Sequence, residues 1–243
     1  MRLVFDVSLE KNTLPLEYRR IIISFIKSAL AQYEGGRFYN QFYGGCVVKN
    51  FSFGVQLGKA TFKDDCIILE NGNIKLVLTI NNDKEGIVIF NSLMGMGMRK
   101  KKFSLGDDNS LVLEKVSINK EVEIKESSVM FKLISPLCLR EHNPHNNKDY
   151  YYSIKSDKFI EKFKTIVRAQ IPKELKPYVE NMQVVPIDCK KTVVKHYGQK
   201  IEVTIGVIAI SAEILLLSHL YKSGVGSRKS AGFGLLDIVG GVK

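Results

Sequence analysis

A segment near the C-terminus combines glycines with basic side chains in a pattern that can bind phosphate. Residues 223–236 read SGVGSRKSAGFGLL and place Arg228 and Lys229 among four glycines. Glycine permits positive φ angles and close approach of the backbone, so such a run can turn its amides toward an anion. Arginine and lysine beside these amides favour a phosphate group.

The common nucleotide-binding glycine motifs differ from this segment in their surroundings, because they follow a strand and open a helix. Here residues 211–222, SAEILLLSHLYK, have the pattern of a helix and precede the glycines. Residues 232–240, GFGLLDIVG, have the pattern of a strand and follow them. This reversed order disfavours a mononucleotide-binding loop.

Composition points to a globular protein with an anionic partner. The chain has 243 residues, of which 45% are hydrophobic, and this length suffices for one large core or two ordinary domains. Its 36 Lys and Arg against 25 Asp and Glu give a net charge of +11. Such a balance favours nucleic acid over a membrane surface as the partner, with evenly spread solubility charge as the alternative.

The cysteines and the apolar segments indicate a cytoplasmic protein. The four cysteines contain no C-x-x-C pair, which argues against a structural zinc site or a disulfide framework, and we expect no metal or other cofactor. Arg2 and Asp6 interrupt the N-terminal apolar stretch, and Glu213 interrupts the window at 205–217, so neither a signal peptide nor a membrane span is expected. The cysteines are Cys46, Cys66, Cys138 and Cys189.

Hydrophobic periodicity predicts the elements of the first half. Residues 2–9 alternate as a half-buried strand does, and residues 14–36 have helical spacing, with Pro15 in the first turn. ENGN, at 70–73, is a good hairpin turn. The further predictions are strands at 51–58, 66–72 and 73–80, a helix at 84–98 and an extended segment at 110–124.

The second half repeats this order. We predict strands at 127–139 and 233–239, helices at 156–170 and 212–222, and a hairpin at 190–211 that turns at Tyr197-Gly198. The helix at 156–170 is expected to begin at a cap formed by Ser156 or Asp157. The order β-α-β-β-α-β in each half is that of the ferredoxin-like unit. The expected fold is therefore α+β, with two tandem ferredoxin-like domains at 1–124 and 128–243 and a C-terminal glycine-rich loop.

A glycine-basic run also occurs in the first half, where GMGMRKKKF follows the apolar part of the second helix. Both runs read G-x-G-x-R-K, and their shared place in the order of elements favours descent from a duplicated unit. The matching residues are Gly95, Gly97, Arg99 and Lys100 in the first half and Gly224, Gly226, Arg228 and Lys229 in the second.

With these features the chain resembles the CRISPR-associated endoribonucleases that cut precursor guide RNA within its repeats, members of the repeat-associated mysterious protein superfamily. The resemblance covers essentially the whole chain and rests first on the C-terminal pattern G-x-G-x-x-x-x-x-G-x-G, at 224–234. LPLEYRRIIISFI resembles the opening helix of the family, KNFSFGV its K-x-F-x-F strand, LISPLCLREHN the start of its second domain, and KKTVVKHYG a hairpin of a bacterial branch.

The resemblance implies tandem ferredoxin-like domains and metal-independent cleavage of repeat RNA that leaves 5′-hydroxyl and 2′,3′-cyclic phosphate ends. RNA carries its own nucleophile, the 2′-hydroxyl, so the reaction requires no metal-bound water. The protein must then align the hydroxyl, accept its proton, stabilise the phosphorane charge and protonate the leaving oxygen. The implied partners are CRISPR repeat RNA or precursor guide RNA and, as further candidates, other subunits of a CRISPR effector complex, with no membrane.

The family often has a histidine between the first helix and the K-x-F-x-F strand, and this chain has none there. Tyr39 and Tyr43 occupy that region, and Lys49 matches the lysine of the family pattern, so these three residues are the catalytic candidates. Tyrosine has an ordinary pKa near 10 and is a poor base unless a cation, here Lys49 or Arg37, lowers that value. Core aromatics with one phosphate-binding lysine are the alternative interpretation.

The remaining candidates concern RNA contact. His142 and His145 resemble a metal pair, but Pro144 breaks the helix that would align them, so polar loop residues are favoured. A non-catalytic RNA-binding subunit is the rival function. The residues expected to contact RNA are Gly224, Gly226, Ser227, Arg228, Lys229, Ser230, Gly232 and Gly234 in the C-terminal loop, Arg99, Lys100 and Lys101 in the first-half run, Arg37, and His196.

Overall fold

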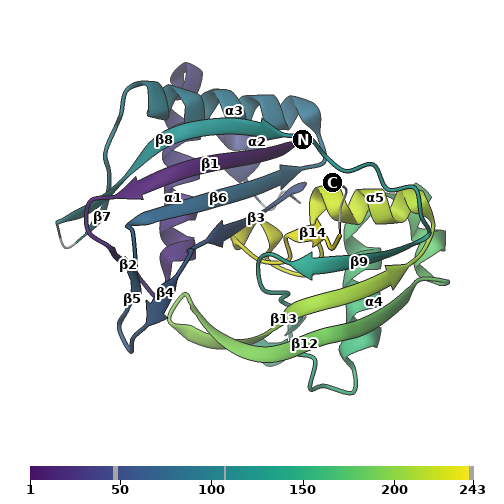
Figure 1. Ribbon diagram of the computed structural model, residues 1–243. Coiled ribbons are helices and arrows are strands. Elements are labelled where there is room, and N and C mark those ends of the chain that lie inside the picture. Colours follow the sequence, from purple (N-terminus) through teal and green to yellow (C-terminus); the bar gives the residue numbers. More distant parts are fainter. Residues whose placement is uncertain (46–48, 107, 241–243) are drawn as a thin grey trace. The chain divides into compact units, whose positions relative to one another are not determined.

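The computed structural model describes residues 1–45, 49–106 and 108–240, and these form a mixed α+β structure (Figure 1). The chain divides into two compact units. The first comprises Met1–Asn50 and Val55–Lys120, and the second comprises Phe51–Gly54 and Glu121–Lys243. The two largest sheets of the structure have five and four strands.

A five-stranded sheet has the order β3-β6-β1-β8-β7; its strands β6, β1, β8 and β7 belong to the first unit, and residues Phe51–Gly54 of β3 are grouped with the second. Strand β1 pairs antiparallel with both β6 and β8. Its alternating residues Leu3, Phe5 and Val7 are buried, as the period-two pattern predicted. The strands are β1 (Arg2–Leu9), β3 (Phe51–Gln56), β6 (Asn73–Ile80), β7 (Phe103–Gly106) and β8 (Asn109–Asn119).

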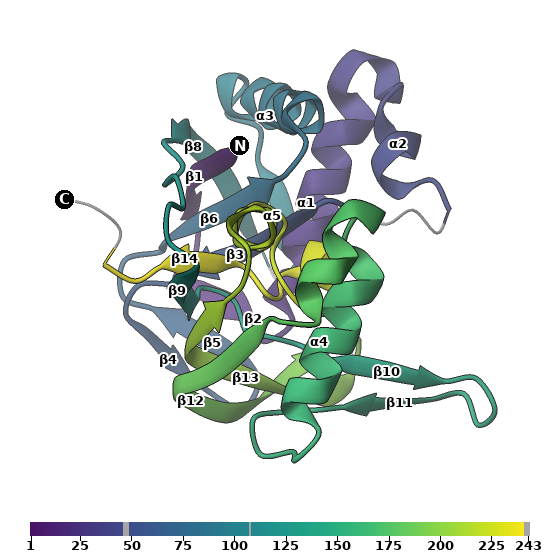
Figure 2. The same cartoon turned by 90° about the vertical axis from the view of Figure 1, so that its right-hand side faces the viewer.

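Helices α1 (Tyr18–Gln32) and α3 (Asp83–Met98) lie on the same face of this sheet (Figure 2). Their apolar stripes enter the core, where Phe25 and Ile26 are fully buried. The side chain of Asn82 caps α3 by accepting hydrogen bonds from the amides of Lys84 and Glu85.

The first helix is shorter than predicted. Pro15 belongs to β2 (Thr13–Pro15) and not to the first turn, because Thr13–Pro15 pairs with β5 (Cys66–Leu69) in a separate three-stranded sheet with β4 (Ala60–Phe62). The ENGN segment is likewise not the turn of a hairpin, since β5 and β6 belong to different sheets. After α1, a short 3-10 turn, η1 (Tyr33–Gly36), leads to helix α2 (Tyr39–Tyr43).

The sheet of the second unit has four strands in the order β12-β13-β9-β14, all paired antiparallel. They are β9 (Ser128–Leu133), β12 (Gln183–His196), β13 (Gln199–Ser211) and β14 (Leu236–Ile238). The β12–β13 hairpin turns at Tyr197-Gly198, as predicted, with positive φ at both residues. In both sheets the first strand lies between the third and the last strand in the chain, β1 between β6 and β8 and β9 between β13 and β14, and β7 is an additional edge strand of the five-stranded sheet.

Helices α4 (Phe159–Gln170) and α5 (Ile214–Ser223) pack with this sheet around one apolar cluster that includes Phe131, Phe163 and Leu216. Helix α4 has no side-chain cap at its first turn, in contrast to the predicted cap at Ser156 or Asp157. The Ser156 hydroxyl instead accepts a hydrogen bond from the amide of Lys158. The remaining elements are β10 (Arg140–Asn143), β11 (Lys148–Tyr151), η2 (Lys173–Val179) and η3 (Lys229–Ala231).

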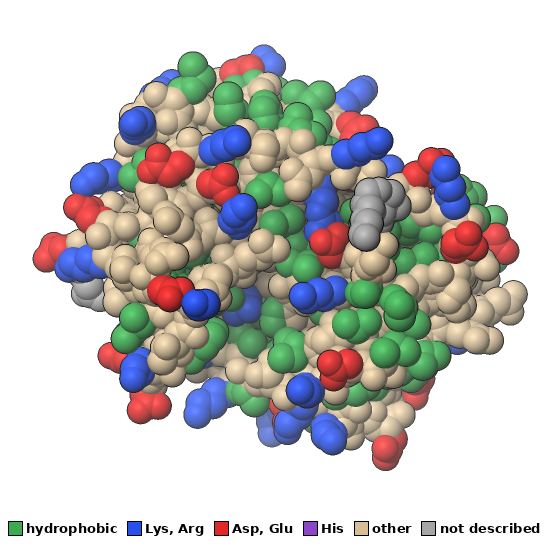
Figure 3. Space-filling view, in the orientation of Figure 1, with side chains coloured by type: hydrophobic (Ala, Val, Ile, Leu, Met, Phe, Trp, Pro, Cys, Tyr) green, Lys and Arg blue, Asp and Glu red, His purple; other side chains and the backbone are tan. Residues whose placement is uncertain are grey.

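Apolar side chains remain exposed over the sheet of the second unit, where Figure 3 shows them gathered. Met130, Val185 and Ile187 are 47%, 51% and 56% exposed. Lysine and arginine side chains are distributed across the same view with acidic groups among them (Figure 3). Within the described residues no helix is long and apolar enough to cross a membrane.

Candidate functional site

The three catalytic candidates lie together in the first unit. The rings of Tyr39 and Tyr43, both on α2, have centroids 5.7 Å apart. Lys49 Nζ lies 5.3 Å from the centroid of the Tyr43 ring, and Lys27 Nζ, from α1, lies 4.8 Å from it. We call Lys27, Tyr39, Tyr43 and Lys49 the tyrosine–lysine cluster.

The cluster supplies hydroxyl and ammonium groups suited to proton transfer and phosphate binding. Cation–π contact with Tyr43 holds both ammonium groups near the two phenols. The Tyr43 hydroxyl is buried, whereas Tyr39 and Lys49 are partly exposed side chains. Tyr39 and Lys49 are therefore the members that a substrate reaches more readily.

Arg37 does not join this cluster. Its guanidinium pairs with Glu34 at 2.7 Å and lies 4.5 Å from the centroid of the Phe38 ring. The side chain is 65% exposed. The cations beside the two tyrosines are therefore lysines and not Arg37. Lys27 was not among the residues predicted from the sequence, because it belongs to α1, the helix that precedes the tyrosines.

The glycine-rich loop, Gly224 to Gly234, joins α5 to β14 and packs closely on its own unit. The Val225 amide donates to the Gly234 carbonyl at 2.9 Å, and the Ser227 amide donates to the Cys138 carbonyl at 2.7 Å. A Cβ on Gly234 would lie 1.7 Å from the Val225 carbonyl oxygen, and the φ of Gly234 is +69°. Glycine is required at this position because two backbone segments meet there.

The two basic residues of this loop are mostly buried, whereas the sequence predicted that they contact RNA phosphates. Arg228 is 24% exposed as a side chain, and its Nη2 donates to the Tyr151 hydroxyl at 2.9 Å. Lys229 is 8% exposed, and burial lowers the pKa of its ammonium to about 8. Lys229 lies in the short turn at 229–231, and its side chain is buried there although burial of an ammonium group is unfavourable.

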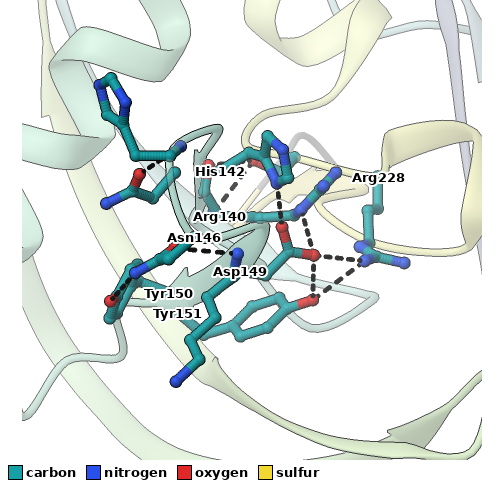
Figure 4. Close-up of polar contacts among 11 residues, drawn as sticks. Arg140, His142, Asn146, Asp149, Tyr150, Tyr151 and Arg228 are labelled. Atoms are coloured by element: carbon teal, nitrogen blue, oxygen red, sulfur yellow. Dashed lines mark hydrogen bonds and ion pairs between the residues drawn. The ribbon is translucent and has the colours of Figure 1, made fainter.

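Asp149 of β11 connects this loop to the β10–β11 hairpin (Figure 4). Its Oδ2 lies 2.6 Å from Arg140 Nε and 3.4 Å from Arg228 Nη2, while its Oδ1 lies 2.9 Å from His142 Nδ1. The bond from Arg140 is the main cause that lowers the pKa of Asp149 to about 2. We call Arg140, His142, Asp149, Tyr151 and Arg228 the Asp149 network.

His142 and Arg228 are the two members of this network that the sequence singled out, and no sequence pattern connected them. Register across the hairpin pairs His142 with Asp149 and Arg140 with Tyr151. The available signal was the short segment PHNN, which is typical of a turn, between the polar segment REHN and the segment KDYY. The contact with Arg228 needed the tertiary fold, since it joins residues 79 positions apart.

His196 and the first-half basic run lie elsewhere. His196 is 2% exposed and packs edge-on against Phe233 at a centroid distance of 5.3 Å, so it is a core residue and not an exposed contact for RNA. Gly95 and Gly97 belong to the end of α3, whereas α5 ends before Gly224, so the two glycine runs differ in backbone conformation. Lys101 Nζ donates to Gln32 Oε1 at 2.7 Å.

Arg99 and Lys100 follow α3 directly, and Lys100 has a φ of +45°.

Among the described residues no group of His, Cys, Asp or Glu is arranged to hold a metal ion. Cys66, Cys138 and Cys189 are free thiols, and Cys46 lies outside the described residues. Burial raises the pKa of the Cys138 thiol to about 12.

Residues 119–238 match the family model described as "CRISPR associated protein Cas6, C-terminal". The matched range contains all strands and helices of the second unit after residue 120, including the Asp149 network and the glycine-rich loop. These residues are thus similar to the C-terminal domain of the Cas6 family of CRISPR-associated proteins.

Solved structures extend the likeness to the fold of the whole chain. A protein from Pyrococcus furiosus, described as Cas6-related, matches with a TM-score of 0.82 and 16% identity over 99% of this chain and 98% of that one. A structure described as an RAMP protein binding different RNA substrates matches with a TM-score of 0.81 and 15% identity over 98% and 99%.

A Cas6 product complex matches with a TM-score of 0.72 and 18% identity over 98% of this chain and 99% of that one. No curated protein matches the sequence. At these identities the solved structures show a common fold, and the roles of single residues rest on the contacts described above.

Proposed function

We propose that this Cas6-type protein binds CRISPR repeat RNA and cleaves precursor guide RNA without a metal ion. The observation that carries the proposal is the tyrosine–lysine cluster. It brings Tyr39, Tyr43 and Lys49 together in a chain whose C-terminal domain is similar to that of the Cas6 family. The solved structure described as an RAMP protein binding different RNA substrates, which shares the fold, supports RNA as the substrate.

In the proposed reaction the 2′-oxygen of the upstream ribose attacks the scissile phosphorus. A bond from that oxygen to phosphorus forms, the bond from phosphorus to the 5′-oxygen breaks, and the products carry 2′,3′-cyclic phosphate and 5′-hydroxyl ends. Tyr39 accepts the proton of the attacking hydroxyl or supplies one to the leaving oxygen. Lys49 stabilises the charge that develops on the phosphorane.

The same order of corresponding strands in the two sheets supports a further part of the proposal. We infer that the chain forms two ferredoxin-like domains, at 1–124 and 128–243. In this arrangement the first domain carries the proton-transfer residues. The second domain holds RNA through its loop and hairpin surfaces.

A non-catalytic RNA-binding subunit is the second candidate function. The absence of histidine from residues 33–51, the region of the cluster, favours it, because histidine is the side chain that most often serves as a general base near neutral pH. The two candidates differ in whether bound RNA is cut.

Incubation of the purified protein with a labelled cognate repeat in EDTA distinguishes them. A single cut that survives chelation is the result expected of the enzyme, and tight binding with intact RNA is the result expected of the rival. A matched repeat with one 2′-deoxyribose immediately upstream of the scissile phosphate serves as the control. It should bind normally and resist cleavage, and cutting of this substrate would show that water or a metal supplies the nucleophile.

A further inference from the structure

One face of the β10–β11 hairpin carries the Asp149 network beside a cavity of about 390 Å³. Register across the hairpin pairs His142 with Asp149 and Arg140 with Tyr151, and residues directly opposite each other project from the same face. Arg140, His142 and Asp149 line the cavity, together with Gln199 of β13. The three network side chains at this cavity therefore lie on one face of the hairpin.

The contacts with Asp149 leave donors of its neighbours to a ligand. Asp149 lies 2.6 Å from Arg140 Nε, which is buried, while the Arg140 side chain as a whole is 34% exposed. The two terminal nitrogens of a guanidinium form a fork that can bind a phosphate group in a bidentate way. His142 meets Asp149 through Nδ1, so Nε2 is its nitrogen left for a ligand, and the side chain is 43% exposed.

The charges of this face add to a positive excess (Figure 4). Arg140 and Arg228 both contact the carboxylate of Asp149, so two guanidinium charges stand against one negative charge. His142 adds a further positive charge when its ring is protonated, which the nearby carboxylate favours and the two guanidinium groups oppose. Asp149 is mostly buried, which limits screening of these charges by water. An anionic ligand at the cavity offsets the excess.

We propose that this cavity binds one phosphate group of the RNA backbone through the terminal nitrogens of Arg140 and Nε2 of protonated His142. The side-chain amide of Gln199 supplies a further donor at the cavity. Arg228 contributes its charge while it stays paired with Asp149. The choice of RNA as the source of the phosphate rests on the proposed function and agrees with the net charge of +11.

Binding of a fluorescein-labelled ten-nucleotide oligouridylate, followed by anisotropy at several salt concentrations, tests the site without a cognate repeat. Arg140→Gln should weaken binding on the order of tenfold, because it removes a charge-assisted contact. It should also lower the slope of log affinity against log salt by roughly 0.7, the value for one contact to a single strand. Arg168→Gln is the matched control, since Arg168 of α4 is an exposed arginine that pairs with Glu180 at 2.9 Å, and it should leave affinity and slope unchanged.

Protonation of His142 gives a second measurement, which a purely structural role of the ring would not affect. Oligouridylate should bind more tightly at pH 6 than at pH 8, because an imidazole ordinarily gains its charge within this range. His142→Gln should lose much of this pH dependence. Thermal unfolding of each variant checks that the fold is kept. Unchanged affinity and slope in Arg140→Gln, or a pH dependence that His142→Gln retains in full, overturns the site.

The unmodified protein provides a readout that does not depend on the folding of a variant. Its four histidines give few ring signals in a ¹H–¹³C spectrum, and oligouridylate should shift those of His142. Ring signals of His142 that stay in place at saturating RNA overturn the site. Inorganic phosphate is the second probe, and it should saturate the shift only at a higher concentration of phosphate groups. Saturation at a lower concentration would assign the cavity to a free anion and overturn the choice of RNA.

The site and the proposed cleavage can fail independently, because the cleavage assay in EDTA and these binding assays use different RNAs. If Arg140→Gln and the His142 signals respond as expected while no repeat is cut, the site is supported and the nuclease proposal fails. If the repeat is cut while Arg140→Gln binds normally and the His142 signals stay in place, the site fails and the nuclease proposal stands.

Discussion

Two ammonium groups approach the ring of Tyr43, one from α1 and one from the segment that precedes β3. At the scale of the residue, these contacts matter because a free lysine side chain samples many rotamers, and ordering it costs about 2 kcal/mol. Cation–π contact offsets part of that cost before a substrate arrives. Lys49 is thereby placed beside the tyrosines with part of its surface open to solvent.

The burial of the Tyr43 hydroxyl leads to a prediction about the two tyrosines. Lys49→Ala and Tyr39→Phe should each slow single-turnover cleavage by on the order of 10²- to 10⁴-fold, the effect of losing a general acid or base or a charge-stabilising group. Tyr43→Phe should have the smaller effect, because its hydroxyl is the less accessible one. Quenched-flow cleavage of a labelled repeat at saturating protein measures these rates.

Lys59→Ala provides the control for charge, since this side chain is 85% exposed and pairs with Glu70 outside the cluster. Its cleavage rate should match that of the parent. Equal rates for Lys49→Ala, Tyr39→Phe, Tyr43→Phe and the parent would show that the cluster is not the catalytic site.

At the scale of the element, the glycine-rich loop is built for close packing. The Gly234 and Val225 backbones approach so closely that no side chain fits between them. The Ser227 hydroxyl accepts a hydrogen bond from the Arg140 amide at 3.1 Å and so ties the loop to β10. The loop thus positions the Asp149 network as well as presenting its own polar groups.

Gly234→Ala should therefore destabilise the protein strongly, by on the order of 3 kcal/mol, because both the clash with Val225 and the positive φ oppose the new Cβ. Gly198→Ala is the matched comparison, since Gly198 also has a positive φ of +75° but has open space around its Cβ position. It should cost about 1 kcal/mol. Urea unfolding followed by circular dichroism measures both, and equal losses would show that steric contact at Gly234 is unimportant.

At the scale of the whole molecule, stability should depend on pH through two groups of opposite charge. Asp149 has its pKa lowered to about 2 from an unfolded value near 4, so its stabilisation is present above pH 4 and is lost as the pH falls toward 2. Lys229 has its pKa lowered to about 8 from an unfolded value near 10. The penalty of burying its charge is complete below pH 8 and is relieved as the pH rises to 10.

The free energy of unfolding should accordingly rise with pH in both windows. Asp149→Asn should flatten the acidic window, and Lys229→Met should flatten the alkaline window while raising stability at pH 7 by removing a buried ammonium. Denaturant titrations between pH 2 and 10 measure these effects. A Lys229→Met protein that is less stable than the parent at pH 7 would indicate an anionic partner for the ammonium.

Local pattern determined a large part of this protein. The alternation in β1, the helical spacing in α1 and α4, and the Tyr-Gly turn of the β12–β13 hairpin each follow from side-chain period and backbone preference, so sequence suffices to predict them. The grouping of Tyr39, Tyr43 and Lys49 was also anticipated, because these residues lie within eleven positions of the chain.

Only the tertiary structure decided which charges are buried and which residues meet across long separations. Arg228 and Lys229 have a sequence context typical of an exposed phosphate loop, yet Arg228 contacts Asp149 and Tyr151 of β11 and Lys229 is buried. Pro15 lies in a strand because Thr13–Pro15 pairs with β5. Asp149 contacts Arg228, which lies 79 positions further along the chain. Such contacts depend on the summed burial and hydrogen bonding of distant segments, and no local period or propensity encodes that sum.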